Sequence, residues 1–187
     1  FPSRLPLLPV FDLLKIHPRQ HGVAVMTLTD RRMGEELCWP QPEGCHRFEQ
    51  YLANIIAYGH MGNICGWLAW RLDGLIKYWA MLYDLQRDYV TDTVAEMKWH
   101  DGRRWLSTSE AVHMGAYRLG RFYVRYSRGL EIWVHYHEVR EDGAVHTEGT
   151  WPVTAHGRRY ELPRYGWLAV KPGAGDQPEL LEYHARV

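Results

Sequence analysis

The sequence predicts a chain in two parts, a mixed α/β segment over residues 1–90 followed by an antiparallel β-sandwich over residues 91–187. Apolar residues in the first part recur at helical spacing, whereas in the second part they alternate with polar ones as in half-buried strands. The alternating segments are short and are separated by turns rich in Gly, Pro and Asp, which is typical of sandwiches. A chain of 187 residues suits one domain of ordinary size or two small ones.

The first part opens with a region rich in Pro and Gly that contains two short apolar runs, LPLLPVFDLL and GVAVMTL. Runs of this kind predict buried strands flanked by irregular loops. A third run, GNICGWLAWRL, predicts a further buried strand that lies between two helices.

The two helices follow from apolar spacing. The first is predicted from His46 to about Met61, with Gly62 as its stop. The second is predicted over Gly74–Tyr89, with Asp73 as its N-cap. Its expected apolar stripe consists of Leu75, Trp79, Leu82 and Gln86, with Ile76 and Tyr83 beside it.

The second part begins with a predicted hairpin. VAEMKW and RWL form its strands, and Asp101-Gly102 is a favoured two-residue turn between them. Ser107 and Glu110 then have the spacing of a capping box, which predicts one short turn of helix.

The strands that follow have a clear alternation. In RFYVRY one face is expected to carry Phe122, Val124 and Tyr126, and the other Arg121, Tyr123 and Arg125. In EIWVHYHE one face is expected to carry Ile132, Val134 and Tyr136, and the other Trp133, His135 and His137. Further strands are predicted near AVHTEGTWPV, RRYELP, GWLAV and LLEYHA. The same alternation separates Tyr165, Trp167 and Ala169 from Leu168 and Val170, while Pro163 and Gly166 mark an edge or a corner.

Composition excludes several classes of function. The 22 basic and 22 acidic residues cancel without a basic cluster, so we expect no nucleic-acid partner. No apolar run approaches the roughly 20 residues of a membrane span, so we expect a soluble chain. No GxSxG, GxGxxG or P-loop pattern occurs, and we expect no cofactor. Cys38, Cys45 and Cys65 form no CxxC, which argues against a thiolate zinc site, although a Cys38–Cys45 bridge stays open.

Aromatic residues are the compositional outlier, with nine Trp and 12 Tyr against four Phe. Trp and Tyr combine an apolar face with a polar edge, which suits sugar rings and wet interfaces. The alternative is an interior with many partly buried aromatic side chains.

The order of several segments resembles a known architecture. KWHDGRRWLSTSEA, YVRYSRGLEIWVHYH, YELPRYGWLAV and LLEYHARV resemble the β-sandwich domain that follows a (β/α)-barrel in a group of glycoside-hydrolase-like bacterial proteins. Upstream, PLLPVFDLLKIHPRQHG resembles a late barrel strand with its loop, and FEQYLANIIAYGHMG and WLAWRLDGLIKYWAMLYDLQRDYV resemble the last barrel helices.

The resemblance implies the C-terminal portion of a carbohydrate-active protein, with carbohydrate as its partner and the sandwich as an accessory domain. A whole barrel needs about 200 residues or more, so further segments or subunits would have to complete the partial barrel. The chain also starts at Phe1 without a Met and ends at Val187 within a strand pattern, so we expect a piece of something longer. The alternative is a non-catalytic structural or carbohydrate-binding module.

Glycoside hydrolysis requires two carboxyl groups, one of them an acid with a raised pKa. Asp12, Glu35 and Glu36 are the favoured candidates, because they are expected at the carboxyl ends of barrel strands, where such sites form. Asp30, Glu43 and Asp73 are further candidates, and the alternative is that all of these are solvated loop charges. Expected sugar contacts are His21, Trp39, His60 and Trp67.

A metal site is a weaker alternative. In HPRQH, His17 and His21 are four residues apart, but Pro18 argues against a helix that would align them. His135 and His137 alternate on one strand and suit Zn or Cu, with His113, His146 or His184 as a third ligand. The alternative is a pair of outward-facing, solvated or hydrogen-bonded imidazoles.

Overall fold

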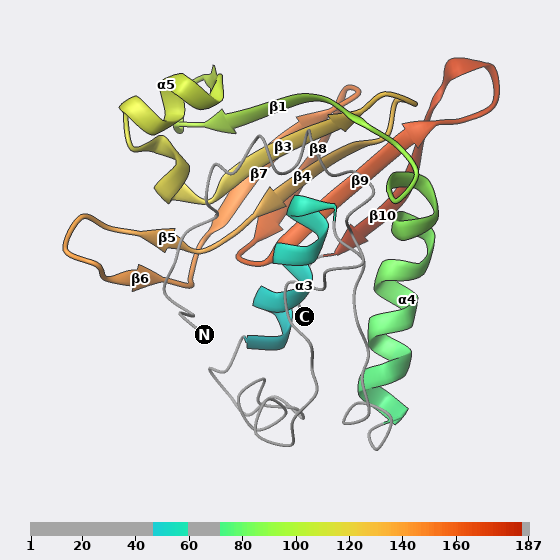
Figure 1. Ribbon diagram of the computed structural model, residues 1–187, viewed down its shortest axis with the longest axis horizontal. Coiled ribbons are helices and arrows are strands. Elements are labelled where there is room, and N and C mark those ends of the chain that lie inside the picture. Colours follow the sequence, from blue (N-terminus) through green and yellow to red (C-terminus); the bar gives the residue numbers. More distant parts are fainter. Residues whose placement is uncertain (1–46, 60–71, 185–187) are drawn as a thin grey trace.

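A computed structural model describes residues 47–59 and 72–184 as a sheet-rich α+β arrangement (Figure 1). Its main element is a six-stranded sheet in the order β10-β9-β4-β3-β1-β2, in which all neighbours are antiparallel. These strands are β1 (Val94–His100), β2 (Trp105–Leu106), β3 (Arg121–Tyr126), β4 (Glu131–His135), β9 (Gly166–Pro172) and β10 (Pro178–His184). Two further antiparallel pairs are β5 (Glu138–Val139) with β6 (Val145–His146), and β7 (Thr150–Ala155) with β8 (Arg158–Pro163).

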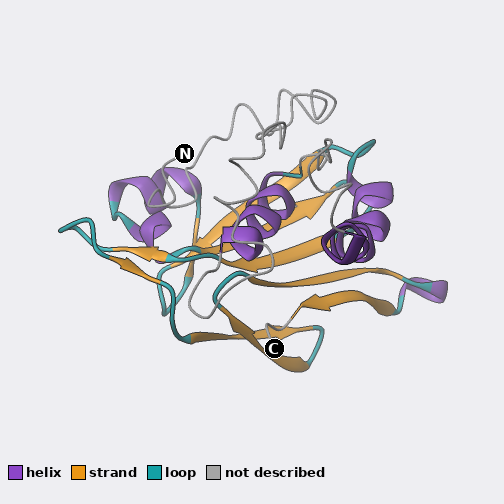
Figure 2. Cartoon of the chain, turned by 90° about the horizontal axis from the view of Figure 1, so that it is seen from below, coloured by secondary structure: helices purple, strands orange, loops and turns teal. Residues whose placement is uncertain are grey.

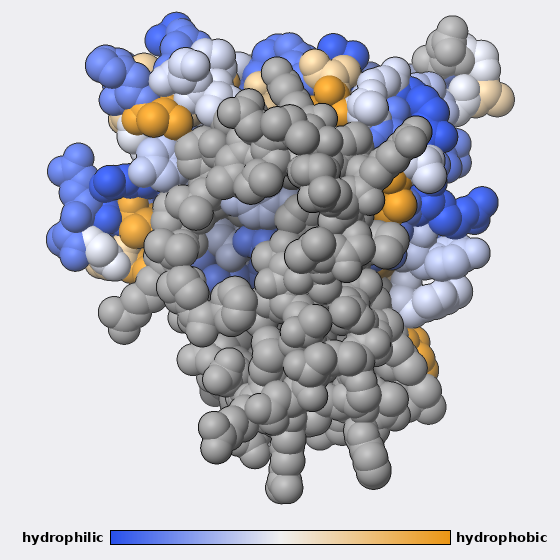
Figure 3. Space-filling view, in the orientation of Figure 1, coloured by the Kyte–Doolittle hydropathy of each residue, from blue (hydrophilic) through white to orange (hydrophobic). Residues whose placement is uncertain are grey.

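Two helices cover one face of the sheet. Figure 2 shows α3 (Arg47–Tyr58) and α4 (Leu72–Tyr89) side by side above it. Their apolar side chains share one core with the inner face of the strands, and Trp99 and Trp167 are among its largest fully buried members. In the orientation of Figure 1, the described residues visible at the edge of the molecule are mostly hydrophilic, with separate hydrophobic spots (Figure 3).

The β7–β8 hairpin packs against the opposite face. A second cluster joins it to the sheet and consists of Trp133, Trp151, Val153, Ala155, Leu162, Leu168 and Val170. The sheet therefore lies between a helical layer and a hairpin layer. This confirms the predicted antiparallel, sheet-rich C-terminal part and is compatible with a sandwich. The barrel-like segment and the boundary near residue 90 stay predictions, since residues 1–46 and 60–71 lie outside the described ranges.

The predicted alternation of the strands is confirmed. Phe122, Ile132 and Trp167 belong to the core under the helices, whereas Trp133 and Leu168 belong to the cluster under the hairpin. The two faces differ because successive side chains of a strand point to opposite sides of the sheet.

The predicted end of the first helix is wrong by several residues. Helix α3 ends at Tyr58, and Gly59 follows with φ 62°, in place of Gly62 as the stop. A Cβ on Gly59 would collide with the hydroxyl of Tyr126 in β3. Glycine is therefore favoured at this position for two reasons, the left-handed backbone and the close approach of Tyr126.

The predicted stripe of the second helix is right for Leu82 and wrong for Trp79, and Ile76 and Tyr83 beside it are also exposed. Leu82, Leu85 and Tyr89 are buried, whereas Trp79 and Tyr83 are exposed, as is Ile76. The buried side of this helix therefore keeps Leu82 from the predicted stripe, adds Leu85 and Tyr89, and leaves out Trp79. The rings of Trp79 and Tyr83 stack on each other 4.9 Å apart, where their polar edges can meet water. Asp73 lies inside α4, which begins at Leu72, so the predicted N-cap position is wrong too.

The hairpin β1–β2 is confirmed, but its loop contains four residues, Asp101 to Arg104, instead of two. The carboxylate of Asp101 accepts hydrogen bonds from the backbone N–H groups of Arg103 and Arg104, at 2.7 and 2.8 Å, which fixes the longer turn. The predicted capping box is present at α5 (Thr108–His113), where Ser107 and Glu110 bond reciprocally.

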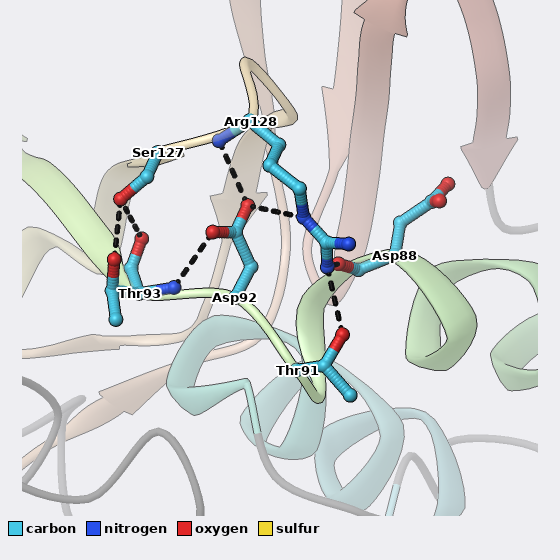
Figure 4. A network of polar contacts seen from close by, with 6 residues as sticks. All are labelled: Asp88, Thr91, Asp92, Thr93, Ser127 and Arg128. Atoms are coloured by element: carbon cyan, nitrogen blue, oxygen red, sulfur yellow. Dashed lines mark hydrogen bonds and ion pairs between the residues drawn. The ribbon is translucent and has the colours of Figure 1, made fainter.

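The junction between α4 and β1 is tied to the β3–β4 turn by the network in Figure 4. The buried carboxylate of Asp92 accepts from the backbone N–H of Arg128 at 2.9 Å and pairs with its guanidinium at 3.3 Å. The same guanidinium donates to the carbonyl of Asp88 and the hydroxyl of Thr91. These bonds hold the end of the helix against the sheet.

The corner between β8 and β9 confirms the interpretation of Pro163 and Gly166, which end one strand and begin the next. Between them the buried Arg164 donates to the carbonyl oxygens of Leu119, Tyr136 and Glu148, at distances of 2.7 to 3.1 Å. It also pairs with the carboxylate of Glu138 at 3.2 Å. One buried cation thus satisfies backbone acceptors from several loops.

Candidate functional site

The catalytic and sugar-binding residues expected from sequence lie outside the described residues and stay predictions. They are Asp12, Glu35, Glu36, His21, Trp39, His60 and Trp67. A candidate site is therefore built from the sheet and its hairpin.

The face of the sheet that carries the β7–β8 hairpin has an ordered arrangement of side chains. Antiparallel register aligns them in rows that run across β2, β1, β3 and β4. The first row contains Trp105, His100, Arg121 and His135, the second Lys98, Tyr123 and Trp133, and the third Glu96, Arg125 and Glu131. Chemistry-bearing side chains from distant parts of the chain thus meet on one surface.

Aromatic rings dominate this surface, and we refer to Trp105, Tyr123, Trp133, Trp151 and His100 as the aromatic platform. Ring centroids are 5.6 Å apart for Trp105 and Tyr123, and 5.1 Å apart for Tyr123 and Trp133. Trp151, from the hairpin, lies 5.8 Å from Trp105 and 5.7 Å from His100. Trp133 and Trp151 are buried, whereas Trp105 is 39% exposed, so the platform opens to solvent at its Trp105 end.

Charged side chains beside the platform are paired. Glu96 contacts Lys98 at 2.7 Å and Arg125 at 3.5 Å. The hydrogen bond from Lys98, and then the two positive charges, lower the pKa of Glu96 despite its slight desolvation. Glu131 pairs with His156, which lies in the hairpin turn, at 3.5 Å.

The platform's own polar groups are held uncharged. Burial raises the pKa of the Tyr123 hydroxyl, and the charges of Glu131 and Glu96 raise it further, so this group stays a hydrogen-bond donor. Burial, followed by the charge of Arg121, lowers the pKa of His100. Nδ1 of His100 accepts from the N–H of Gly102 at 3.0 Å, so the neutral ring carries its proton on Nε2.

The outward position expected for His135 and His137 is wrong, whereas the hydrogen bonding expected as the alternative to a metal site is confirmed. His135 is 1% exposed and His137 is 0% exposed. Nδ1 of His135 donates to the carbonyl of Leu162 at 2.7 Å, and His137 bonds to the hydroxyl of Tyr165 at 3.2 Å. Strand β4 ends at His135, so alternation does not extend to His137. Within residues 47–59 and 72–184, no three His, Cys, Asp or Glu side chains gather as metal ligands would.

Two hollows lie elsewhere on the described surface. A cleft of about 720 Å³ separates α5 and the following 3₁₀ turn (Ala116–Leu119) from the β5–β6 hairpin, and its lining carries charges of both signs. A smaller one of about 290 Å³ adjoins the Asp92–Arg128 network. Neither hollow includes a platform residue.

The sequence pattern separates Tyr123 from Phe122 and Trp133 from Ile132 within each strand, but it does not show that Tyr123 and Trp133 share a face with Trp105 and Trp151. The available signal was the β1–β2 hairpin, whose register sets His100 opposite Trp105. The position of Trp151 depends on how the β7–β8 hairpin folds over the sheet, which no local pattern indicates.

Across the described ranges, the helices fall short of the length and apolarity that a membrane-spanning helix requires. Comparisons with models of protein families, with curated proteins and with solved structures find no match. The geometry of the platform is therefore the basis for a functional proposal.

Proposed function

We propose that this part of the chain is a non-catalytic carbohydrate-binding module of a carbohydrate-active protein, and that a sugar ring stacks at the open end of the aromatic platform. The observation that carries the proposal is the solvent-exposed ring of Trp105 beside the half-buried ring of Tyr123, 5.6 Å away. A paired ring surface of this kind offers an apolar face to the C–H groups of a sugar.

Polar groups at the rim suit the hydroxyl groups of the same ligand. The Nε2–H of His100 is an uncharged hydrogen-bond donor at the platform itself, and the hydroxyl of Tyr123, which bonds to the carboxylate of Glu131, still has a lone pair that can accept. A few fixed polar groups around an apolar surface give orientation and specificity.

A binding role fits the electrostatics better than hydrolysis does. A glycosidase needs a carboxylic acid that keeps its proton, which requires a raised pKa. Glu96, beside the platform, has a lowered pKa because Lys98 and Arg125 stabilise its charge.

The test is glycan binding by the full chain, first on an array and then by calorimetry. We expect Trp105→Ala to weaken binding about tenfold or more, which corresponds to about 1.4 kcal/mol. Trp79→Ala is the matched control, since it removes a tryptophan that is 58% exposed on helix α4, on the helical side of the sheet. Absence of glycan binding, or equal losses in the two variants, would contradict the proposal.

The resemblance to glycoside-hydrolase-like proteins supports a wider proposal, in which a barrel that includes the first part of this chain carries the catalytic carboxylates. Glu35→Gln and Glu36→Gln test it in a preparation with hydrolytic activity. Turnover should fall by orders of magnitude for a true acid or nucleophile, and unchanged turnover would remove both residues as candidates.

A further inference from the structure

Arg121 occupies a central position on the platform side of the sheet. It begins β3 and lies directly opposite His135 in β4. It directly precedes Phe122, which pairs with Trp99, so the antiparallel register continues from Trp99 and Phe122 to His100 and Arg121. Its Nη1 is 3.2 Å from where a Cβ on Gly102 would lie, so the guanidinium reaches the β1–β2 turn. Trp105 pairs with His100 at the same end of the sheet. Arg121 therefore lies close to the open end of the platform.

Within the described residues, this guanidinium has neither a carboxylate partner nor a hydrogen bond, and its Nε is buried without an acceptor. Neighbouring cations differ: Arg125 and Lys98 share Glu96, and Arg164 pairs with Glu138. A buried donor without an acceptor is unfavourable and is rare in folded proteins. The unmet bonding capacity of Arg121 is thus a specific feature of this surface.

The groups that face Arg121 leave its charge uncompensated. Burial lowers the pKa of His100 in β1 and of His135 in β4, and the charges of Arg121 and Arg164, respectively, lower these pKa values further. Both imidazoles therefore favour the neutral form. Arg164, at the β8–β9 corner, is close enough for the charge of Arg121 to contribute to its lowered pKa, but it is paired with Glu138. The carboxylate of Asp101 bonds to its own turn. Within the described residues, Arg121 is therefore a cation that can still pair with an anion.

We propose that Arg121 binds the anionic group of an acidic sugar, so that the platform selects glycans carrying a carboxylate or a sulfate. This inference rests on the proposed function, in which Trp105 stacks on a sugar ring. A guanidinium can form two parallel hydrogen bonds to a carboxylate or a sulfate, and such charge-assisted bonds are stronger than neutral ones. Stacking on Trp105 would provide affinity for the sugar ring, and Arg121 would provide selectivity for anionic sugars over neutral ones.

The test compares two ligands that differ only in charge. Affinities of the full chain are measured for a uronic-acid oligosaccharide and for its carboxyl-reduced, neutral counterpart. We expect the acidic sugar to bind at least about tenfold more tightly, with an advantage that shrinks as salt is added. A sulfated oligosaccharide of the same length forms a third arm, which shows whether a sulfate replaces the carboxylate.

Two variants test whether Arg121 is the side chain responsible for the preference for acidic sugars. Arg121→Gln should make the acidic and neutral sugars bind alike, whereas Arg125→Gln, which alters a cation already paired with Glu96, should keep the preference. Thermal unfolding checks that both variants fold, and the comparison of ligands on the unaltered chain needs no variant.

The outcomes separate this inference from the proposed function. Equal binding of charged and neutral sugars, with both weakened by Trp105→Ala, would overturn the role of Arg121 and leave the platform as a sugar site. Binding of none of the three oligosaccharides would overturn the role of Arg121, and the absence of any binding on the glycan array as well would overturn the proposed function.

Discussion

Acid should weaken the fold through His135, which is buried beneath the β7–β8 hairpin. Burial, and then the positive charge of Arg164, lower the pKa of His135 to about 3. In an unfolded chain a histidine titrates near 6.5. As the pH falls through this interval, His135 binds a proton in the unfolded chain but stays neutral in the folded one. The stability that His135 contributes is thus complete above about pH 6.5 and is lost progressively towards about pH 3.

The size of the effect follows from the same two values. Between about pH 7 and about pH 5 the protonation of an unfolded histidine lowers the free energy of unfolding by about 2 kcal/mol, provided that the native imidazole stays neutral. A loss of this size is a large fraction of the stability of an ordinary domain.

Urea unfolding of the native chain and of His135→Asn, across a series of pH values, measures this directly. The asparagine amide can still donate to the carbonyl of Leu162, so the variant removes the titration and keeps the bond. Over that interval the native chain should lose about 2 kcal/mol more than the variant does. His113→Asn, at an exposed position, should behave as the native chain does. An identical pH dependence for native and His135→Asn proteins would refute the reasoning.

Three further substitutions test the fold by equilibrium unfolding. Gly120→Ala places a Cβ 2.6 Å from two backbone carbonyl oxygens at φ 68° and should cost about 3 kcal/mol or more, whereas Gly115→Ala, at φ 71° in open space, should cost about 1 kcal/mol. Equal losses would show that the close approach is absent. Asp92→Asn weakens the pairing with Arg128 and should cost about 1–3 kcal/mol, and an unchanged midpoint would mean that the network does not hold the junction. Ser107→Ala removes one half of the capping box and should cost about 1 kcal/mol, which a stability equal to that of the native chain would exclude.

The sequence pattern correctly predicts those features that depend only on residues close together in the chain. The faces of Phe122 and Tyr123 follow from the two-residue period of a strand, and the bond between Ser107 and Glu110 needs only one turn of helix. The buried side of α4 does not follow in this way. Apolar spacing places Trp79 and Leu82 in one stripe, yet Leu82 is buried and Trp79 is exposed, because contacts with the rest of the core decide which side of the helix is covered.

The candidate site depends on contacts between distant segments, which explains why sequence reasoning found only part of it. Tyr123 and Trp151 meet through the fold of a hairpin over the sheet. His135 was expected at a surface because its strand alternates, but the hairpin covers that surface. Arg164 donates hydrogen bonds to the backbone carbonyl groups of Leu119 and Glu148, and the local sequence around Arg164 does not indicate these partners.

The β7–β8 ladder is separate, within the described residues, from the ladder of the six-stranded sheet. Its backbone amides can therefore exchange with deuterium through a subglobal opening that leaves the large sheet intact, whereas those of β4, which is paired on both sides, require a larger unfolding event. Such an opening would hydrate Trp151 and admit a proton to His135. Acid would then release the hairpin as a cooperative unit before the remaining strands separate, and it would remove one wall of the aromatic platform in the same event.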